Sequence, residues 1–232
     1  MPHGASLLVL DAGSRDATRA IAGEAGATVI ERPWTDFIDA RRFALARVRT
    51  PWTFMLDADE RLDEQLRAAL SAADPERDGV DGYRVRRLTR FCGAPIHALG
   101  WSNERLLRIF RTDRATIVPH PVAGGGAALH ERWEVRGRVA DLAGTLIHDS
   151  YPDRDSYQRK FARYTSLEAE GVEGTSVALV LSALLAIPRF LWFLGPRGGL
   201  RAGWRGAYLA FWSALYPVVV QQKALRGRTR SR

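Results

Sequence analysis

The chain has 232 residues, of which 46% are hydrophobic and 26% are charged, and Cys92 is its single cysteine. This composition excludes an intrinsically disordered chain, a collagen-like chain and a disulfide-stabilised scaffold. The formal net charge is +8: residues 1–170 carry 25 basic and 25 acidic side chains, whereas residues 171–232 carry nine basic and one acidic. Because the first part is neutral and the second mixes cations with long apolar runs, we expect no nucleic-acid partner.

The first third of the chain alternates apolar runs with amphipathic segments. The expected order is a strand at 6–10, a helix reaching Ala25, a strand at 28–30, a helix at 37–49, a strand at 52–56 and a helix through Leu62 and Leu70. Strands that alternate with helices predict an α/β fold with a mainly parallel sheet flanked by helices. Acidic residues follow two of the strands, at Asp11 and at Asp57. Both groups should lie at the carboxyl edge of the sheet, where open α/β sheets bind ligands.

The remainder of the chain divides into a β-rich part and an apolar part. Residues 82–148 contain short β-rich segments, residues 151–170 are typical of a polar helix, and residues 175–194 are almost wholly apolar. Twenty residues suffice to cross a bilayer, but Pro188 and Arg189 interrupt this run, which favours helices lying in the membrane interface. A single membrane span and a soluble helical hairpin covering the sheet are the alternatives. We expect a domain at 1–170, membrane-associated helices at 171–222 and a basic disordered tail at 223–232.

The segment Asp57-Ala58-Asp59 is the sharpest local indication of chemistry. Two carboxylates one residue apart at a strand end suit Mg²⁺ or Mn²⁺ together with a diphosphate, because these ions prefer oxygen ligands and substrate phosphates. A solvated acidic turn is the alternative interpretation. Arg41 and Arg42 lie upstream, where they either neutralise phosphate charge or form the exposed face of a helix.

Several segments, in order and spacing, resemble family 2 glycosyltransferases of the GT-A fold. They are residues 9–18, 39–45 and 52–60, and later 82–83, 100–101, 107–111, 129–131, 146–148, 160 and 163–164. The later set is similar to the branch that includes the lipopolysaccharide core β-glucosyltransferases. The resemblance covers nearly the whole chain, including Pro188-Arg189-Phe190 and residues 199–216.

The resemblance implies roles for individual residues. It assigns Asp11 to the uracil or ribose of a UDP-sugar, Arg41 to a nucleotide contact and Trp101 to the cleft for the sugar and acceptor. Asp57 and Asp59 match the metal-binding Asp-x-Asp, with Asp59 as the more direct ligand. Arg42 stands where asparagine is common in the family.

A base and a third metal ligand are also expected. An inverting transferase needs a carboxylate to deprotonate the acceptor hydroxyl, and Glu131, with the neighbouring His130, is the candidate. A salt bridge from Glu131 to Arg132 or Arg136 is the alternative. His148 is a candidate ligand of a divalent metal, Mg²⁺ or Mn²⁺, or else a structural histidine.

The resemblance implies an inverting, metal-dependent enzyme that moves a hexose, glucose by preference, from a UDP-sugar to a lipid-linked or lipopolysaccharide core acceptor. Only ten residues precede Asp11, so the usual first strand of the fold is expected to be missing. The alternative is therefore a non-catalytic, membrane-bound relative that has lost its donor site. The basic, Trp-containing C-terminal region predicts attachment to the cytoplasmic face of the inner membrane through residues 175–220.

Overall fold

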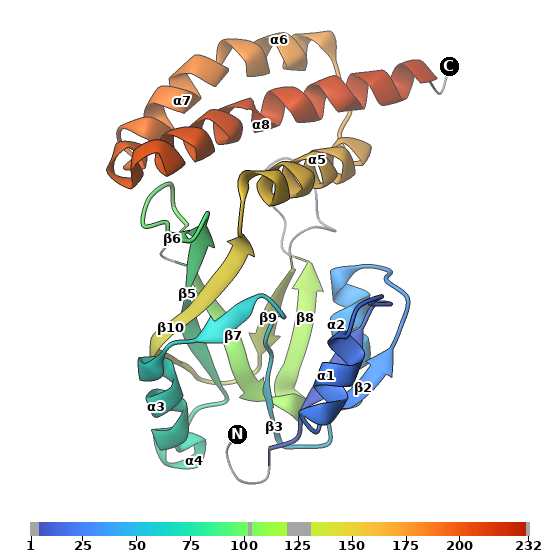
Figure 1. Ribbon diagram of the computed structural model, residues 1–232, viewed down its shortest axis with the longest axis vertical. Helices are drawn as coiled ribbons and strands as arrows, with labels where there is room; N and C mark the ends of the chain where they lie inside the picture. The colour runs from blue at the N-terminus through green and yellow to red at the C-terminus, as the bar shows by residue number, and fades with distance from the viewer. Residues whose placement is uncertain (1–4, 102–103, 120–130, 231–232) are drawn as a thin grey trace.

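The computed structural model describes residues 5–101, 104–119 and 131–230. An α/β body occupies one end of the molecule and a layer of helices the other (Figure 1). The strands are β1 Leu8–Asp11, β2 Thr28–Glu31, β3 Trp52–Phe54, β4 Glu60–Leu62, β5 Gly82–Phe91, β6 Ala94–Pro95, β7 Glu104–Arg111, β8 Ala115–Pro119, β9 Glu131–Val135 and β10 Val139–Tyr151. The helices are α1 Thr18–Glu24, α2 Phe37–Leu45, α3 Glu64–Ala72, α4 Pro75–Asp78, α5 Arg154–Glu170, α6 Ser176–Leu184, α7 Ala186–Leu194 and α8 Gly203–Arg230, with short 3-10 turns η1 Thr112–Arg114 and η2 Gly199–Ala202.

The α/β class is confirmed, but the sheet is more mixed than the mainly parallel arrangement expected. In the described residues β1 and β2 form a parallel pair, and the larger sheet has the order β3-β7-β5-β10-β4, with β6 paired to β5. Only β5 and β10 run parallel in that larger sheet. The connections are consistent with this: a two-residue turn joins β5 to antiparallel β6, whereas a long excursion separates β5 from parallel β10.

Helices α2 and α3 of the body begin where acidic residues cap them. The side chain of Asp36 accepts the backbone N–H of Asp39 at the start of α2, and that of Asp63 accepts the N–H of Leu66 at the start of α3. Leu66 is fully buried against the large sheet, with Val85 and Leu146. On the other side, Ile38 of α2 packs against the cluster that contains Phe110.

The helical layer lies across the ends of β5 and β10, with α5 between the sheet and α8 (Figure 1). Phe91 of β5, Tyr157 and Phe161 of α5, and Leu209 of α8 form one buried cluster. Burying these side chains stabilises the attachment by roughly 1.5–3 kcal/mol for each. The C-terminal α8 is therefore packed on the body through one face.

The prediction of a disordered tail at 223–232 is wrong for residues 223–230, because α8 continues to Arg230. The helix persists because its last turns have partners on α5. Lys223 Nζ donates to the carbonyl of Ala162 at 2.7 Å and to Thr165 Oγ1 at 2.8 Å, and Ala224 is buried.

Helices α6 and α7 expose a long apolar surface. Ser176–Leu194 is one helical run long and apolar enough to cross a membrane by length and composition, and none of it is buried. Val177, Leu184 and Ile187 are each more than two-thirds exposed. The run is interrupted at Leu185, between α6 and α7. Pro188 lies in the first turn of α7, where a missing backbone N–H is tolerated.

Candidate active site

Asp57, just after β3, lies between two arginines. Arg41 of α2 donates to its Oδ1 at 2.9 Å, and Arg108 of β7 donates to its Oδ2 at 2.9 Å. Burial opposes ionisation of Asp57, but the positive charges of Arg108 and Arg41 outweigh it and hold its pKa below the ordinary value. Both carboxylate oxygens of Asp57 are thus held by guanidinium groups.

Arg108 and Glu60 form a buried ion pair beside Asp57, and sequence reasoning gave neither a role. The side chain of Arg108 is 4% exposed and that of Glu60 is 0% exposed. Glu60 also accepts the backbone N–H of Asp57 at 3.2 Å, so the pair fixes the turn that presents the acidic residues. One feature could have revealed it: Arg108 is a charge inside the apolar run at 106–110, and a buried charge requires a partner.

Asp59 has a separate set of partners. His148 Nε2 of β10 lies 3.2 Å from Asp59 Oδ2, and Lys160 Nζ of α5 lies 3.7 Å from the same oxygen. The hydrogen bond from His148 lowers the pKa of Asp59 to about 2, against burial and with the help of the nearby charges. Lys160 also donates to the carbonyl of Ser150 at 3.0 Å, which holds it at this place.

Glu131, at the start of β9, pairs with Arg41. Arg41 therefore joins Glu131 to Asp57, and it links the candidate base to the Asp-x-Asp turn. The alternative partner Arg132 instead pairs with Glu134, at 2.6 Å. His130 lies outside the described residues.

Asp11, the predicted nucleotide contact, is buried at the end of β1. Its Oδ2 accepts the backbone N–H groups of Gly13 and Ser14 at 3.0 and 2.9 Å, and its Oδ1 accepts the Ser14 hydroxyl. These hydrogen bonds lower the pKa of Asp11, and the bond from the Ser14 hydroxyl has the largest effect. The carboxylate shapes the turn after β1 and is ionised at neutral pH.

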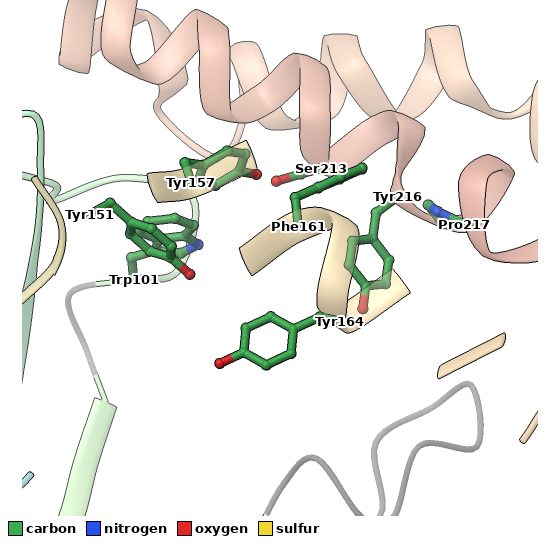
Figure 2. Close-up of a pocket in the computed structure, with 8 residues that line it drawn as sticks. All are labelled: Trp101, Tyr151, Tyr157, Phe161, Tyr164, Ser213, Tyr216 and Pro217. Carbon is green, nitrogen blue, oxygen red and sulfur yellow. The ribbon is translucent and has the colours of Figure 1, made fainter. Parts of the chain in front are cut away.

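Trp101 lies toward the helical layer, next to Tyr151 with 5.6 Å between ring centroids (Figure 2). Lys160 Nζ lies 5.1 Å from the centroid of the Tyr151 ring. Trp101 therefore belongs with the Asp59 side of the site, through Tyr151 and Lys160, and not with the Asp57 side.

The three predicted metal ligands are brought together only in part. Asp59 and His148 meet, whereas Asp57 is engaged by Arg41 and Arg108. Within the described ranges, no three His, Cys, Asp or Glu side chains form a group that could hold a metal ion. One carboxylate and one imidazole suit a divalent ion whose remaining ligands are phosphate oxygens and water.

Comparisons with known proteins identify the family of the chain. The family model described as Glycosyl transferase family 2 matches residues 5–132, more than half of the chain. The lipopolysaccharide core biosynthesis glycosyltransferase LpsC of Rhizobium meliloti is 28% identical over 97% of this chain and 86% of its own length. An uncharacterized glycosyltransferase of Rickettsia typhi is 30% identical over 71% of this chain and 58% of its own.

A TPR repeat-containing protein of Synechococcus elongatus is 53% identical, over 45% of this chain and only 25% of its own length. That match covers a part of a much longer protein. The chain is a glycosyltransferase and belongs to glycosyl transferase family 2.

Proposed function

We propose that this glycosyltransferase moves a hexose, glucose by preference, from a UDP-sugar to a lipid-linked or lipopolysaccharide core acceptor, with inversion at the anomeric carbon. The observation that carries the proposal is that the two carboxylates of the Asp-x-Asp turn have different basic partners. Asp57 pairs with two arginines, and Asp59 pairs with His148 and Lys160. Such a turn offers anionic and cationic groups to a diphosphate at the same place. The printed name of the Rhizobium meliloti relative, lipopolysaccharide core biosynthesis, supports the choice of acceptor.

We assign the ligands of a divalent metal, Mg²⁺ or Mn²⁺, to Asp59 and His148, and we assign Asp57 to orienting Arg41. The metal, when bound, neutralises charge that develops on the departing diphosphate. Arg41, in contact with both Asp57 and Glu131, is placed to bind the nucleotide diphosphate. Asp11 is assigned to the uridine.

Glu131 is the proposed general base. It would accept the proton of the acceptor hydroxyl as that oxygen attacks the anomeric carbon and the UDP oxygen departs. The side chain of Glu131 is 10% exposed, and its pairing with Arg41 keeps it directed at the same site as Asp57. His130, its sequence neighbour, is proposed to assist it.

We further propose that the enzyme works at the cytoplasmic face of the inner membrane, attached through α6 and α7. The exposed apolar run Ser176–Leu194 supports this attachment. Arg189, Arg197 and Arg201 on or beside this run suit anionic lipid headgroups. A lipid-linked acceptor and a soluble UDP-sugar would meet at this surface.

The test is transfer of radiolabelled glucose from UDP-glucose to lipopolysaccharide with a truncated core, by the full chain in lipid nanodiscs. We expect EDTA to abolish transfer and Mg²⁺ or Mn²⁺ to restore it. Asp59→Asn should be inactive, and Asp113→Asn, an exposed carboxylate outside the site, should match the wild type. Full transfer in EDTA together with an active Asp59→Asn enzyme would reject the metal assignment. No transfer from any UDP-sugar would favour a non-catalytic role.

A further inference from the structure

A cavity of about 280 Å³ lies between α5 and α8, apart from the Asp-x-Asp turn. Six aromatic side chains line it: Trp101, Tyr151, Tyr157, Phe161, Tyr164 and Tyr216 (Figure 2). Ser213 and Pro217 of α8 complete the wall. Its volume is close to the lower end of the range for small-ligand sites, roughly 300 Å³.

The lining combines flat aromatic faces with hydroxyl groups. Figure 2 shows the hydroxyls of Tyr151 and Tyr164 on the side of the cavity away from α8. A wall of ring faces with hydroxyls at its edge matches a sugar ring, which presents C–H groups on its faces and hydroxyls on its rim.

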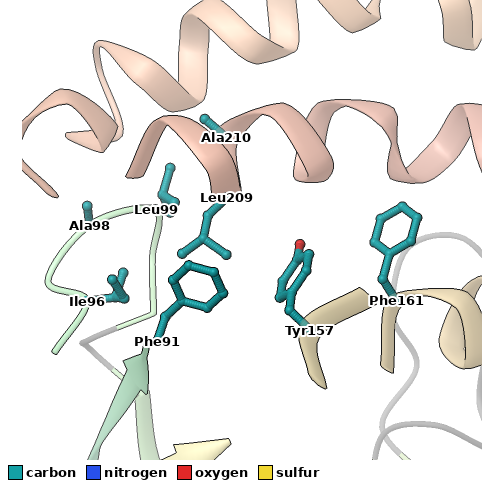
Figure 3. Close-up of a cluster of buried hydrophobic side chains, with 8 residues drawn as sticks. All are labelled: Phe91, Ile96, Ala98, Leu99, Tyr157, Phe161, Leu209 and Ala210. Carbon is teal, nitrogen blue, oxygen red and sulfur yellow. The ribbon is translucent and has the colours of Figure 1, made fainter. Parts of the chain in front are cut away.

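The walls of the cavity are held in place by the core. Tyr157 and Phe161 are both 7% exposed and belong to the cluster that joins α5 to Phe91 and Leu209 (Figure 3). The Phe161 ring also meets that of Tyr216 edge to face, with 5.5 Å between centroids. A site with such fixed walls is formed before its ligand arrives, which lowers the entropic cost of binding.

The cavity is connected to the acidic turn through two contacts. Tyr151 forms part of the cavity wall, and Lys160 Nζ lies 5.1 Å from the centroid of its ring. The same Nζ lies 3.7 Å from Asp59 Oδ2. A saccharide seated against Tyr151 would therefore extend past Lys160 toward Asp59. The helices that carry the exposed apolar run, α6 and α7, pack on α8, the opposite wall.

We propose that this aromatic cavity is the acceptor subsite and that it takes a sugar ring of the acceptor glycan by stacking on Trp101 and Tyr151. The proposal rests on the function proposed above, since it identifies where the acceptor of that same reaction binds. It also gives α8 a role in addition to packing against α6 and α7: α8 supplies Ser213 and Tyr216 to the substrate site.

The test is binding of deacylated lipopolysaccharide core oligosaccharide to the full chain in nanodiscs, measured by saturation-transfer difference NMR without any donor. Ser213→Leu adds side-chain volume inside the cavity, and Tyr164→Ala removes one ring and hydroxyl from its edge. We expect each to weaken binding at least tenfold. Gln222→Leu places the same leucine at an exposed position of the same helix, and it should bind as the wild type does.

Thermal unfolding of each variant shows whether it is folded. If Ser213→Leu does not fold, binding by Tyr164→Ala decides the test. Unchanged binding in the folded variants, or no oligosaccharide signal with the wild type, would overturn the proposal. Displacement of the oligosaccharide by decanoate with saturation transfer to the acyl protons would assign the cavity to a lipid chain instead. Because no donor is used, oligosaccharide binding by a protein that transfers no glucose would reject the proposed function and leave the subsite standing.

Discussion

His148 Nε2 lies 3.2 Å from Asp59 Oδ2, across the pairing of β10 with β4. This contact is the largest of the causes, with the charge of Lys160 among the others, that together lower the pKa of Asp59 from 3.8 to about 2 against burial. A depressed carboxyl pKa stabilises the folded protein above the unfolded value of 3.8, and that contribution is lost as the pH falls toward about 2.

We therefore expect Asp59 to be ionised at pH 4 and His148→Ala to raise its pKa toward 3.8. Carboxyl-carbon NMR over pH 1.5–6 measures this directly. His97→Ala removes an exposed histidine elsewhere and should leave the titration of Asp59 unchanged. An equal midpoint in the wild type and His148→Ala would contradict the assigned cause.

Arg108→Met should destabilise the fold, because it leaves the fully buried Glu60 carboxylate without its closest cation. Breaking such a pair costs about 3–5 kcal/mol. Urea unfolding gives the value. Arg105→Met, on the same strand but with its ion pair half-exposed, should cost less than about 1 kcal/mol. Adding Glu60→Gln to Arg108→Met should recover part of the loss, and a further loss would contradict the pairing argument.

Glu131→Gln should reduce transfer on the order of 10²–10⁴-fold if Glu131 is the base, because the amide cannot accept the proton. The affinity for UDP, measured by calorimetry, should change little. Glu134→Gln alters an exposed carboxylate of the same strand and should retain transfer. Equal activity in the two variants would remove Glu131 from the mechanism.

Gly206→Ala should loosen the helical layer. A Cβ at Gly206 would fall 1.9 Å from the backbone oxygen of Gly199, and backbone cannot move aside cheaply. We expect a loss of about 1–3 kcal/mol in the free energy of unfolding. Gly227→Ala, on the same helix with open space around its Cβ, should instead gain roughly 0.5–1 kcal/mol. Equal effects in thermal unfolding would argue against close packing of η2 on α8.

The double variant Leu184→Glu with Ile187→Glu should lose its affinity for membranes. These side chains are 68% and 70% exposed on α6 and α7, and charges there oppose insertion into the apolar layer. Sedimentation with vesicles of phosphatidylethanolamine and phosphatidylglycerol measures binding. Leu7→Glu with Ile21→Glu, exposed apolar positions of the α/β body, should sediment as the wild type does. Equal sedimentation of both double variants would locate the attachment elsewhere.

Sequence reasoning predicted the strand ends at Asp11 and before Asp57 because apolar runs and turn residues are local signals. It also predicted α2 and α5 to within a few residues, since their amphipathic spacing is local as well. The helix expected through Leu62 and Leu70 begins only at Glu64, because Leu62 belongs to β4 and pairs with β10. It could not predict the mixed strand directions of the large sheet, which depend on which distant strands pair.

The sequence by itself determined the family, the α/β class, the acidic turn and the separation of a neutral body from a basic, apolar C-terminal region. The tertiary structure decided which charges share a partner: Asp57 with Arg41 and Arg108, and Asp59 with His148 and Lys160. It also decided that α8 packs on α5 and encloses an aromatic cavity. The physical reason is that composition and periodicity are properties of neighbouring residues, whereas ion pairs and cavities form between different elements of the fold, as between Arg108 and Asp57, which are 51 residues apart.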